Sequence, residues 1–130
     1  MSNKKCLILY VDDHEDSAQM LKLILTDADY EIQNARTAAE ALRLASTESF
    51  DLYVVDKHLP DGSGLELITK LNRLTPGVPS IVYTGDAYEI HREQALAAGA
   101  DAYVCKPNID ELIATVHAFV SQRECATAAG

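Results

Sequence analysis

The chain has 130 residues, 48% of them hydrophobic, and a formal net charge of −9. This length fits one domain with one core. The excess of acid argues against direct binding to nucleic acid, because phosphate backbones are bound by basic surfaces. The chain has no long uncharged apolar stretch and does not start like a signal peptide. We therefore expect a cytoplasmic protein without membrane contact.

Short apolar runs alternate along the chain with segments of helical period. Runs of this length without polar alternation are typical of strands that are covered on both faces, as in a parallel sheet. The second run is shorter and more polar, which indicates an edge strand. In chain order, the expected strands are Cys6–Val11, 31–35, Leu52–Val55, 81–83 and Ala102–Cys105.

Between these strands, apolar residues recur at the spacing of one helical face. Thr37 and Glu40 form a capping-box pair that opens the second helix. The fourth helix is expected over about residues 88–98, with Gly99 as its terminating residue. Asn108 is suited to cap the fifth helix.

Five strand–helix repeats predict an α/β fold with a parallel sheet and helices on both faces. We expect one domain over residues 1–123, followed by a C-terminal tail over 124–130. In open sheets of this kind, ligands bind at the carboxyl ends of the strands.

Residues suited to phosphate chemistry follow four of the strands. The first strand ends in Asp12-Asp13, the third in Asp56, the fourth in Thr84 and the fifth in Lys106. Because parallel strands end at the same edge of the sheet, we expect these side chains to meet in one crevice.

Three carboxylates at close range repel one another unless a cation joins them. Mg²⁺ (or Mn²⁺) suits carboxylate and carbonyl oxygens, and we find no set of imidazoles and thiolates of the kind that zinc prefers. A carboxylate such as Asp56 can be a nucleophile in phosphoryl transfer. Lys106 and Thr84 are of the right type to receive the charge of the product.

These motifs together resemble the receiver domain of response regulators in two-component signalling. The resemblance implies a doubly wound, flavodoxin-like (βα)5 fold with five parallel strands in the order 2-1-3-4-5. The matching pieces are Val11-Asp12-Asp13, Val54-Val55-Asp56, Leu59-Pro60 with Gly64, Tyr83-Thr84-Gly85, and residues 99–107.

The resemblance also implies a role for each residue of the acidic site. Asp56 is the expected phosphoacceptor, which a sensor histidine kinase or a histidine phosphotransfer protein would phosphorylate. Asp13 and Asp56 are expected to bind Mg²⁺ directly, together with the main-chain carbonyl of His58. Asp12 is expected to act mainly through water.

The remaining family positions concern the phosphoryl group and the switch. Thr84 and Lys106 are expected to contact the phosphoryl group, and the bond between Lys106 and Pro107 to be cis. Thr84 and Tyr103 are expected to move together on activation, with Tyr103 turning inward. This movement changes a surface formed by the fourth helix, the fifth strand and the fifth helix, through which an unknown downstream protein binds.

His58 and Asp86 flank the mouth of the expected site. We hypothesise that they set the lifetime of the phosphorylated state; the alternative is a solvated pair without effect. The other histidines are interpreted as ordinary surface or helix residues: His14, His91 and His117.

Two other functions remain open: an interaction module that works without phosphorylation, and a Mg²⁺-dependent phosphohydrolase with an aspartyl-phosphate intermediate. The receiver interpretation predicts no enzyme activity beyond the protein's own phosphorylation and dephosphorylation. It predicts a monomer or a phosphorylation-dependent dimer, and either a complete regulator or the receiver part of a longer one.

Overall fold

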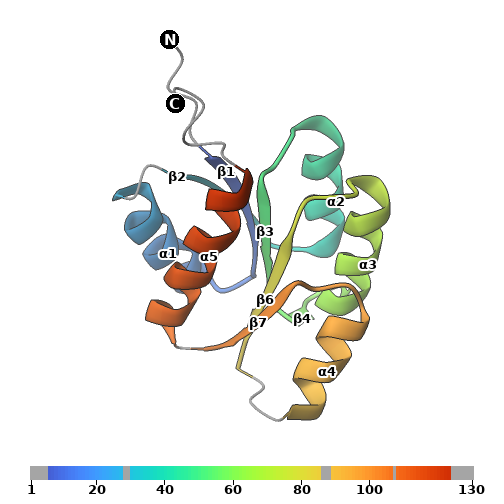
Figure 1. Ribbon diagram of the computed structural model, residues 1–130. Helices are drawn as coiled ribbons and strands as arrows, with labels where there is room; N and C mark the ends of the chain where they lie inside the picture. Colours follow the sequence, from blue (N-terminus) through green and yellow to red (C-terminus); the bar gives the residue numbers. More distant parts are fainter. Residues whose placement is uncertain (1–5, 28–29, 86–88, 107, 124–130) are drawn as a thin grey trace.

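The computed structural model describes residues 6–27, 30–85, 89–106 and 108–123, in which strands and helices alternate (Figure 1). The strands of the main sheet are β1 (Cys6–Val11), β2 (Tyr30–Ala35), β3 (Leu52–Val55), β6 (Ser80–Thr84) and β7 (Ala102–Cys105). The helices are α1 (Glu15–Asp27), α2 (Ala38–Thr47), α3 (Gly64–Leu74), α4 (Glu89–Ala97) and α5 (Ile109–Arg123).

The main sheet has five strands in the order β2-β1-β3-β6-β7, and every neighbouring pair is parallel. Since β6 and β7 are the fourth and fifth strands of this sheet, the predicted order 2-1-3-4-5 is confirmed, and β2 lies at an edge as expected. Helices α1 and α5 cover one face of the sheet, while α2, α3 and α4 cover the other (Figure 1). The fold is the predicted doubly wound α/β fold.

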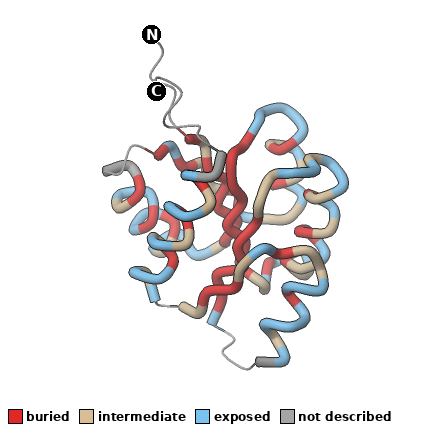
Figure 2. Tube along the Cα trace, in the orientation of Figure 1, coloured by how far each residue is buried: buried red, intermediate tan, exposed pale blue. Residues whose placement is uncertain are grey.

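The central strands are buried on both faces, which explains their uninterrupted apolar sequence (Figure 2). In β1, Ile8 and Tyr10 belong to the core beneath α1 and α5. Their neighbours Leu9 and Val11 belong to the core beneath α2 and α3. Because alternate residues of a strand point to opposite faces, a strand between two helical layers must be apolar at every position.

Most of the predicted helix boundaries are confirmed. The Thr37 hydroxyl accepts from the main-chain N–H of Glu40 at 3.0 Å, and the Asn108 carboxamide accepts from that of Glu111 at 3.2 Å. Gly99 has a φ of +113°, as expected of a residue that terminates a helix. The predicted start of the fourth helix, at residue 88, lies outside the described residues.

A small antiparallel pair that the sequence did not predict follows β3. Strands β4 (His58–Leu59) and β5 (Gly62–Ser63) form a hairpin. In its turn, the Asp61 carboxylate accepts hydrogen bonds from the first main-chain N–H groups of α2, at 2.9 and 3.1 Å. The chain after Asp56 is thereby attached to the start of the second helix.

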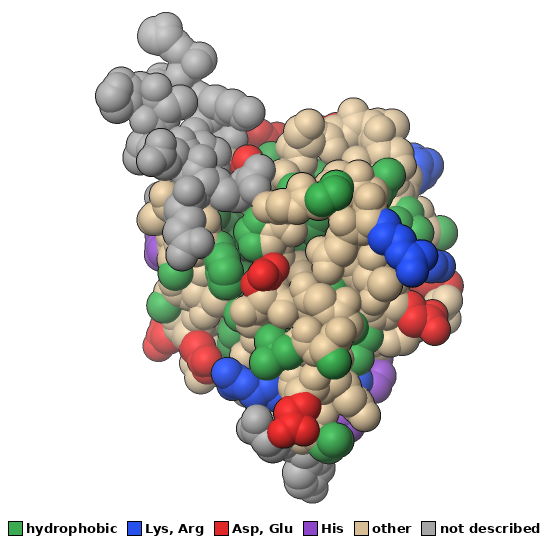
Figure 3. All heavy atoms as spheres, turned by 45° about the vertical axis from the view of Figure 1, so that its right-hand side comes forward, with side chains coloured by type: hydrophobic (Ala, Val, Ile, Leu, Met, Phe, Trp, Pro, Cys, Tyr) green, Lys and Arg blue, Asp and Glu red, His purple; other side chains and the backbone are tan. Residues whose placement is uncertain are grey.

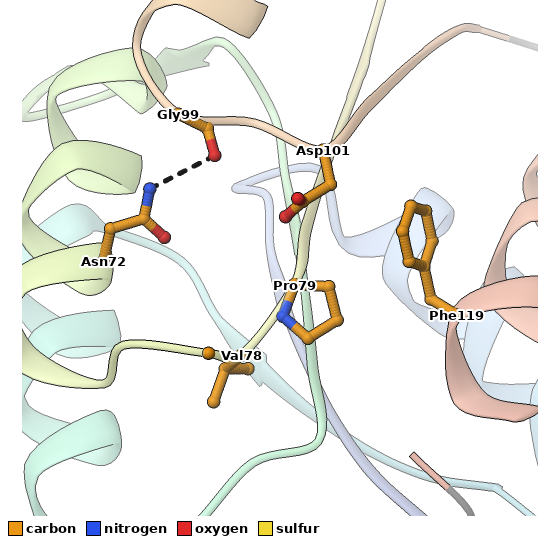
Figure 4. A pocket seen from close by; sticks show the side chains of 7 residues that line it. Asn72, Val78, Pro79, Gly99, Asp101 and Phe119 are labelled. Atoms are coloured by element: carbon orange, nitrogen blue, oxygen red, sulfur yellow. Dashed lines mark hydrogen bonds between the residues drawn. The ribbon is translucent and has the colours of Figure 1, made fainter. Parts of the chain in front are cut away.

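The amino-terminal edge of the sheet contains a hollow of about 730 Å³ (Figure 4). Asn72 points toward Gly99 there and donates to its carbonyl oxygen at 3.1 Å. Asp101 accepts from the main-chain N–H of Ser80 at 2.9 Å. These polar groups hold the loop before β7 in place, at the edge opposite to the predicted site.

Within the ranges that the structure describes, no helix is both long and apolar enough to cross a bilayer. On the face shown in Figure 3, acidic, basic and apolar side chains are interspersed.

Candidate functional site

All five parallel strands end at the carboxyl edge of the sheet, and main-chain hydrogen bonds there align the residues that follow β1, β3 and β7. The N–H of Asp12 donates to the carbonyl of Ala35 at 3.0 Å, and that of Asp56 to the carbonyl of Val11 at 2.9 Å. The N–H of Lys106 donates to the carbonyl of Thr84 at 2.7 Å. The strand ladder thus continues one residue beyond β1, β3 and β7 and sets Asp12, Asp56 and Lys106 at one edge of the sheet.

Lys106 joins two of the predicted carboxylates. Its ammonium lies 2.7 Å from Asp12 Oδ2 and 3.2 Å from Asp56 Oδ2. Burial by itself would lower the pKa of Lys106, but the hydrogen bond to Asp12 and the charges of Asp56 and Asp12 raise it above its ordinary value. The lysine is therefore charged at neutral pH, and its single charge offsets part of the charge of the two buried carboxylates.

Asp12 is fully buried and is satisfied by several donors. Besides Lys106, the hydroxyl of Tyr10 donates to its Oδ2 at 2.6 Å. The main-chain N–H of His14 donates to Oδ1 at 2.9 Å. Burial would raise the pKa of Asp12, but hydrogen bonds from Lys106, Tyr10 and His14 outweigh it and hold that pKa below its ordinary value.

Tyr10 is a site residue that the sequence analysis missed. It is fully buried in β1, and burial together with its hydrogen bond to Asp12 raises its pKa. A signal for it existed, because a buried tyrosine normally finds a partner for its hydroxyl. A carboxylate two positions further along the strand projects to the same face.

The chain around Asp56 is tightly constrained. Its side chain is nearly buried, and its Oδ1 accepts from the main-chain N–H of His58 at 3.2 Å. A Cβ atom added at Gly64 would lie 2.0 Å from the main-chain oxygen of Asp56. Glycine is therefore required where α3 begins, because any side chain would displace the loop that follows Asp56.

A third group approaches the carboxylates from the start of α1. One oxygen each of Asp12 and Asp56 and a ring nitrogen of His14 lie within 4.8 Å of one another. Asp13 is not in this set of three, but its Oδ1 lies 3.4 Å from His14 Nδ1 and its side chain is 38% exposed. Anionic oxygens at such spacing fit a divalent cation. From the sequence, His14 was interpreted as an ordinary surface or helix residue.

The remaining predicted residues lie around this centre or outside the described residues. Thr84 is buried at the end of β6, and Tyr103 is buried in the core cluster beneath α3 and α4. His58 is exposed at the mouth of the site. Asp86 and Pro107, and with Pro107 the predicted cis bond, lie outside the described residues.

Comparisons with known proteins point to one family. The family model of the response regulator receiver domain matches residues 8–117. The chain is 37% identical over 119 residues to the response regulator protein PilR of Pseudomonas aeruginosa. The aligned region covers 88% of this chain and 26% of PilR. The chain is 36% identical to the transcriptional regulatory protein KdpE of Mycobacterium tuberculosis, covering 92% of this chain and 53% of KdpE. The chain thus spans about a quarter of PilR and about half of KdpE.

Solved structures agree. A CheY-like response regulator receiver domain protein from Methanospirillum hungatei superposes with a TM-score of 0.86 at 37% identity, covering 92% of this chain and 97% of that one. A second structure is a response regulator from Burkholderia pseudomallei, solved with a phosphorylated aspartic acid, a calcium ion and citrate. It superposes with a TM-score of 0.81 at 35% identity. It covers 95% of this chain and 74% of that one.

Proposed function

Because this chain belongs to the family of response regulator receiver domains of two-component signalling, we propose that it accepts a phosphoryl group on Asp56. The observation that supports this choice is the ammonium of Lys106, which bridges Asp12 and Asp56 at 2.7 and 3.2 Å. A fixed cation beside the nucleophile is placed to neutralise charge on an incoming phosphoryl group.

The reaction transfers phosphorus from nitrogen to oxygen. One carboxylate oxygen of Asp56 attacks the phosphorus of a phosphohistidine on the donor protein. A new O–P bond forms and the N–P bond breaks, and the imidazole nitrogen keeps the electron pair. The N–H of His58, 3.2 Å from Asp56 Oδ1, orients the nucleophile. Lys106 and the hydroxyl of Thr84 are proposed to receive the oxygens of the transferred group.

A divalent cation, Mg²⁺ or Mn²⁺, is proposed at the same site. Its ligands would be Asp13, Asp56 and the main-chain carbonyl of His58, with Asp12 acting through water. When bound, it supplies positive charge that offsets the repulsion between the carboxylates and the phosphoryl oxygens. The related Burkholderia protein, solved with a phosphorylated aspartic acid and a calcium ion, supports this assignment.

The proposed switch couples Thr84 to Tyr103. Both side chains are buried, with Thr84 1% and Tyr103 5% exposed, which supports a coupling through the protein interior. Phosphorylation adds charge and acceptor oxygens beside Thr84, and thereby favours one arrangement of a two-state element. We propose that the change is read by a downstream protein at the surface of α4, β7 and α5.

The lifetime of the phosphorylated state is proposed to depend on His58 and Asp86. His58 supports this because it follows Asp56 by two residues and is exposed at the mouth of the site. Replacing both by alanine and timing phosphate loss tests the idea. An unchanged half-life would show that the two side chains are merely solvated.

The wider setting is likewise proposed. The phosphoryl donor would be a sensor histidine kinase or a histidine phosphotransfer protein, and the domain would act in the cytoplasm as a monomer or a phosphorylation-dependent dimer. It would catalyse only its own phosphorylation and dephosphorylation. The receiver domain would extend over residues 1–123, with 124–130 as a tail.

Incubation with acetyl phosphate, with and without Mg²⁺, tests the proposed function by intact mass. We expect a metal-dependent gain of one phosphoryl group that Asp56→Asn abolishes. No gain with any small-molecule donor or kinase would contradict the proposal and favour a phosphorylation-independent interaction module. Steady hydrolysis of added phosphomonoesters would instead indicate a phosphohydrolase.

A further inference from the structure

The ring of His14 lies against the carboxylates of the acidic site although its side chain is 66% exposed. Its Nδ1 is 2.8 Å from Asp12 Oδ1 and 3.4 Å from Asp13 Oδ1. The imidazole nitrogen therefore occupies a position that attracts positive charge.

Two hydrogen bonds hold the main chain of His14 in place. The N–H of His14 donates to Asp12 Oδ1 at 2.9 Å, and the carbonyl of His14 accepts from the N–H of Ala18 at 3.1 Å, as the first hydrogen bond of α1. His14 is thus fixed on both sides, by the carboxylate that follows β1 and by the first turn of the helix.

The spacing of these atoms, which includes the hydrogen bond between His14 Nδ1 and Asp12 Oδ1, also fits groups that surround one ion. For ligands about 2.1 Å from a metal, adjacent corners of an octahedron lie about 3.0 Å apart, and those of a tetrahedron about 3.4 Å. The two distances from His14 Nδ1, 2.8 and 3.4 Å, bracket these values. A ligand oxygen of Asp56 lies within 4.8 Å of a His14 ring nitrogen, which leaves room for one ion between them.

We propose that His14 supplies a nitrogen ligand through Nδ1, so that this site also takes divalent first-row ions that accept imidazole, such as Co²⁺, Ni²⁺ and Zn²⁺. The inference rests on the proposed function, because it concerns the same cation site. Two carboxylates and one imidazole form a mixed oxygen–nitrogen set that suits these ions, whereas Mg²⁺ prefers oxygen alone. With Asp13, Asp56 and the main-chain carbonyl of His58, His14 makes four protein ligands, which leaves two positions of an octahedron for water or a phosphoryl oxygen.

Zn²⁺ is a suitable probe because it is diamagnetic. In long-range ¹H–¹⁵N NMR spectra of the full chain, each of the four histidine rings gives its own pair of nitrogen signals. At one equivalent of Zn²⁺ we expect Nδ1 of His14 to take a metal-bound shift while the other three rings stay unchanged. Mg²⁺ should not produce this shift. A His14 ring that does not respond, or four rings that respond together, would overturn the inference.

Calorimetry measures the consequence for selectivity. His14→Phe keeps a planar ring without donor atoms, and we expect it to weaken Zn²⁺ binding at least about tenfold, since even ligands' hydrogen-bond partners have effects of that size. Because Mg²⁺ binds through oxygens, its affinity should change by no more than about twofold. His117→Phe, a matched change on α5 where the ring contacts Tyr30, should leave Zn²⁺ binding as it is.

The outcomes separate this inference from the function on which it rests. If His14→Phe strengthens the binding of both ions alike, His14 is only a positively charged neighbour and the inference is wrong. If wild-type protein gains a phosphoryl group with Mg²⁺ but His14 never binds Zn²⁺, only the inference fails. Absence of any phosphorylation would instead contradict the proposed function.

Discussion

The hydrogen bond from Tyr10 to Asp12 gives the most direct estimate of how much the acidic site stabilises the fold. Tyr10→Phe removes only the hydroxyl, which lies 2.6 Å from Asp12 Oδ2 inside the protein. A hydrogen bond to a charged group contributes about 1.5–3 kcal/mol. Asp12 keeps Lys106 and His14 as donors, so no buried charge is left unpaired. We therefore expect the free energy of unfolding to fall by about this amount at neutral pH.

Tyr53→Phe is the matched control. Tyr53 is also a fully buried strand tyrosine, but its hydroxyl bonds to the neutral hydroxyl of Thr75 at 2.8 Å. A bond between neutral groups contributes about 0.5–1.5 kcal/mol. Urea denaturation followed by circular dichroism, with the metal removed by chelation, measures both changes in the free energy of unfolding.

The pH dependence distinguishes the two bonds. The pKa of Asp12 in the folded state lies below its ordinary value of 3.8, so its ionised form contributes stability above that value and loses it as the pH falls through the folded pKa. The effect of Tyr10→Phe should therefore shrink in acid, while that of Tyr53→Phe should not. An effect of Tyr10→Phe that is no larger than that of its control, or that does not depend on pH, would refute the reasoning.

Three further changes have defined outcomes. Gly64→Ala puts a methyl group 2.0 Å from the main-chain oxygen of Asp56. It should lower the free energy of unfolding by about 1–3 kcal/mol and slow phosphorylation by acetyl phosphate. An unchanged rate would mean that the loop after Asp56 accommodates the methyl group without moving the Asp56 side chain. Lys106→Met leaves two nearly buried carboxylates with less positive charge, which should cost about 3–5 kcal/mol in the presence of chelator and be partly restored by Mg²⁺. No recovery of the melting temperature would argue against a cation at these carboxylates. Thr37→Ala removes the acceptor for the N–H of Glu40 and should cost about 1 kcal/mol by urea denaturation, whatever the metal.

The fold was predictable because each of its determinants is local. Both the run Leu52–Val55 and the cap at Thr37 are visible within a few residues, and parallel strands joined by helices leave few arrangements. The hairpin of β4 and β5 was missed because two residues per strand show no periodicity. The cap that Asp61 places on α2 was missed because 22 or 23 residues separate the partners.

The site was predictable as a group of residue types but not as a set of contacts. Topology brings the ends of all five parallel strands to one edge of the sheet. Since β3 and β6 separate β1 from β7, the contact between Asp12 and Lys106 is made by the long side chain of the lysine. Which donors share an oxygen of Asp12 depends on side-chain packing, which the sequence does not show. Tyr10 was therefore interpreted only as part of the apolar first strand, and the hydrogen bond of its hydroxyl was missed. His14 was read as surface for a related reason: its exposure is real, but the backbone of the turn directs its Nδ1 back to the carboxylates.

The identity of the phosphorylated residue tests the central claim most directly. An aspartyl phosphate is an acyl phosphate, which borohydride reduces to the alcohol, so a phosphorylated aspartate becomes homoserine. After treatment with acetyl phosphate and Mg²⁺ followed by borohydride, tandem mass spectrometry should find homoserine at position 56 and aspartate unchanged at positions 12 and 13. Homoserine at either of those positions, or at none, would contradict the assignment of Asp56 as phosphoacceptor.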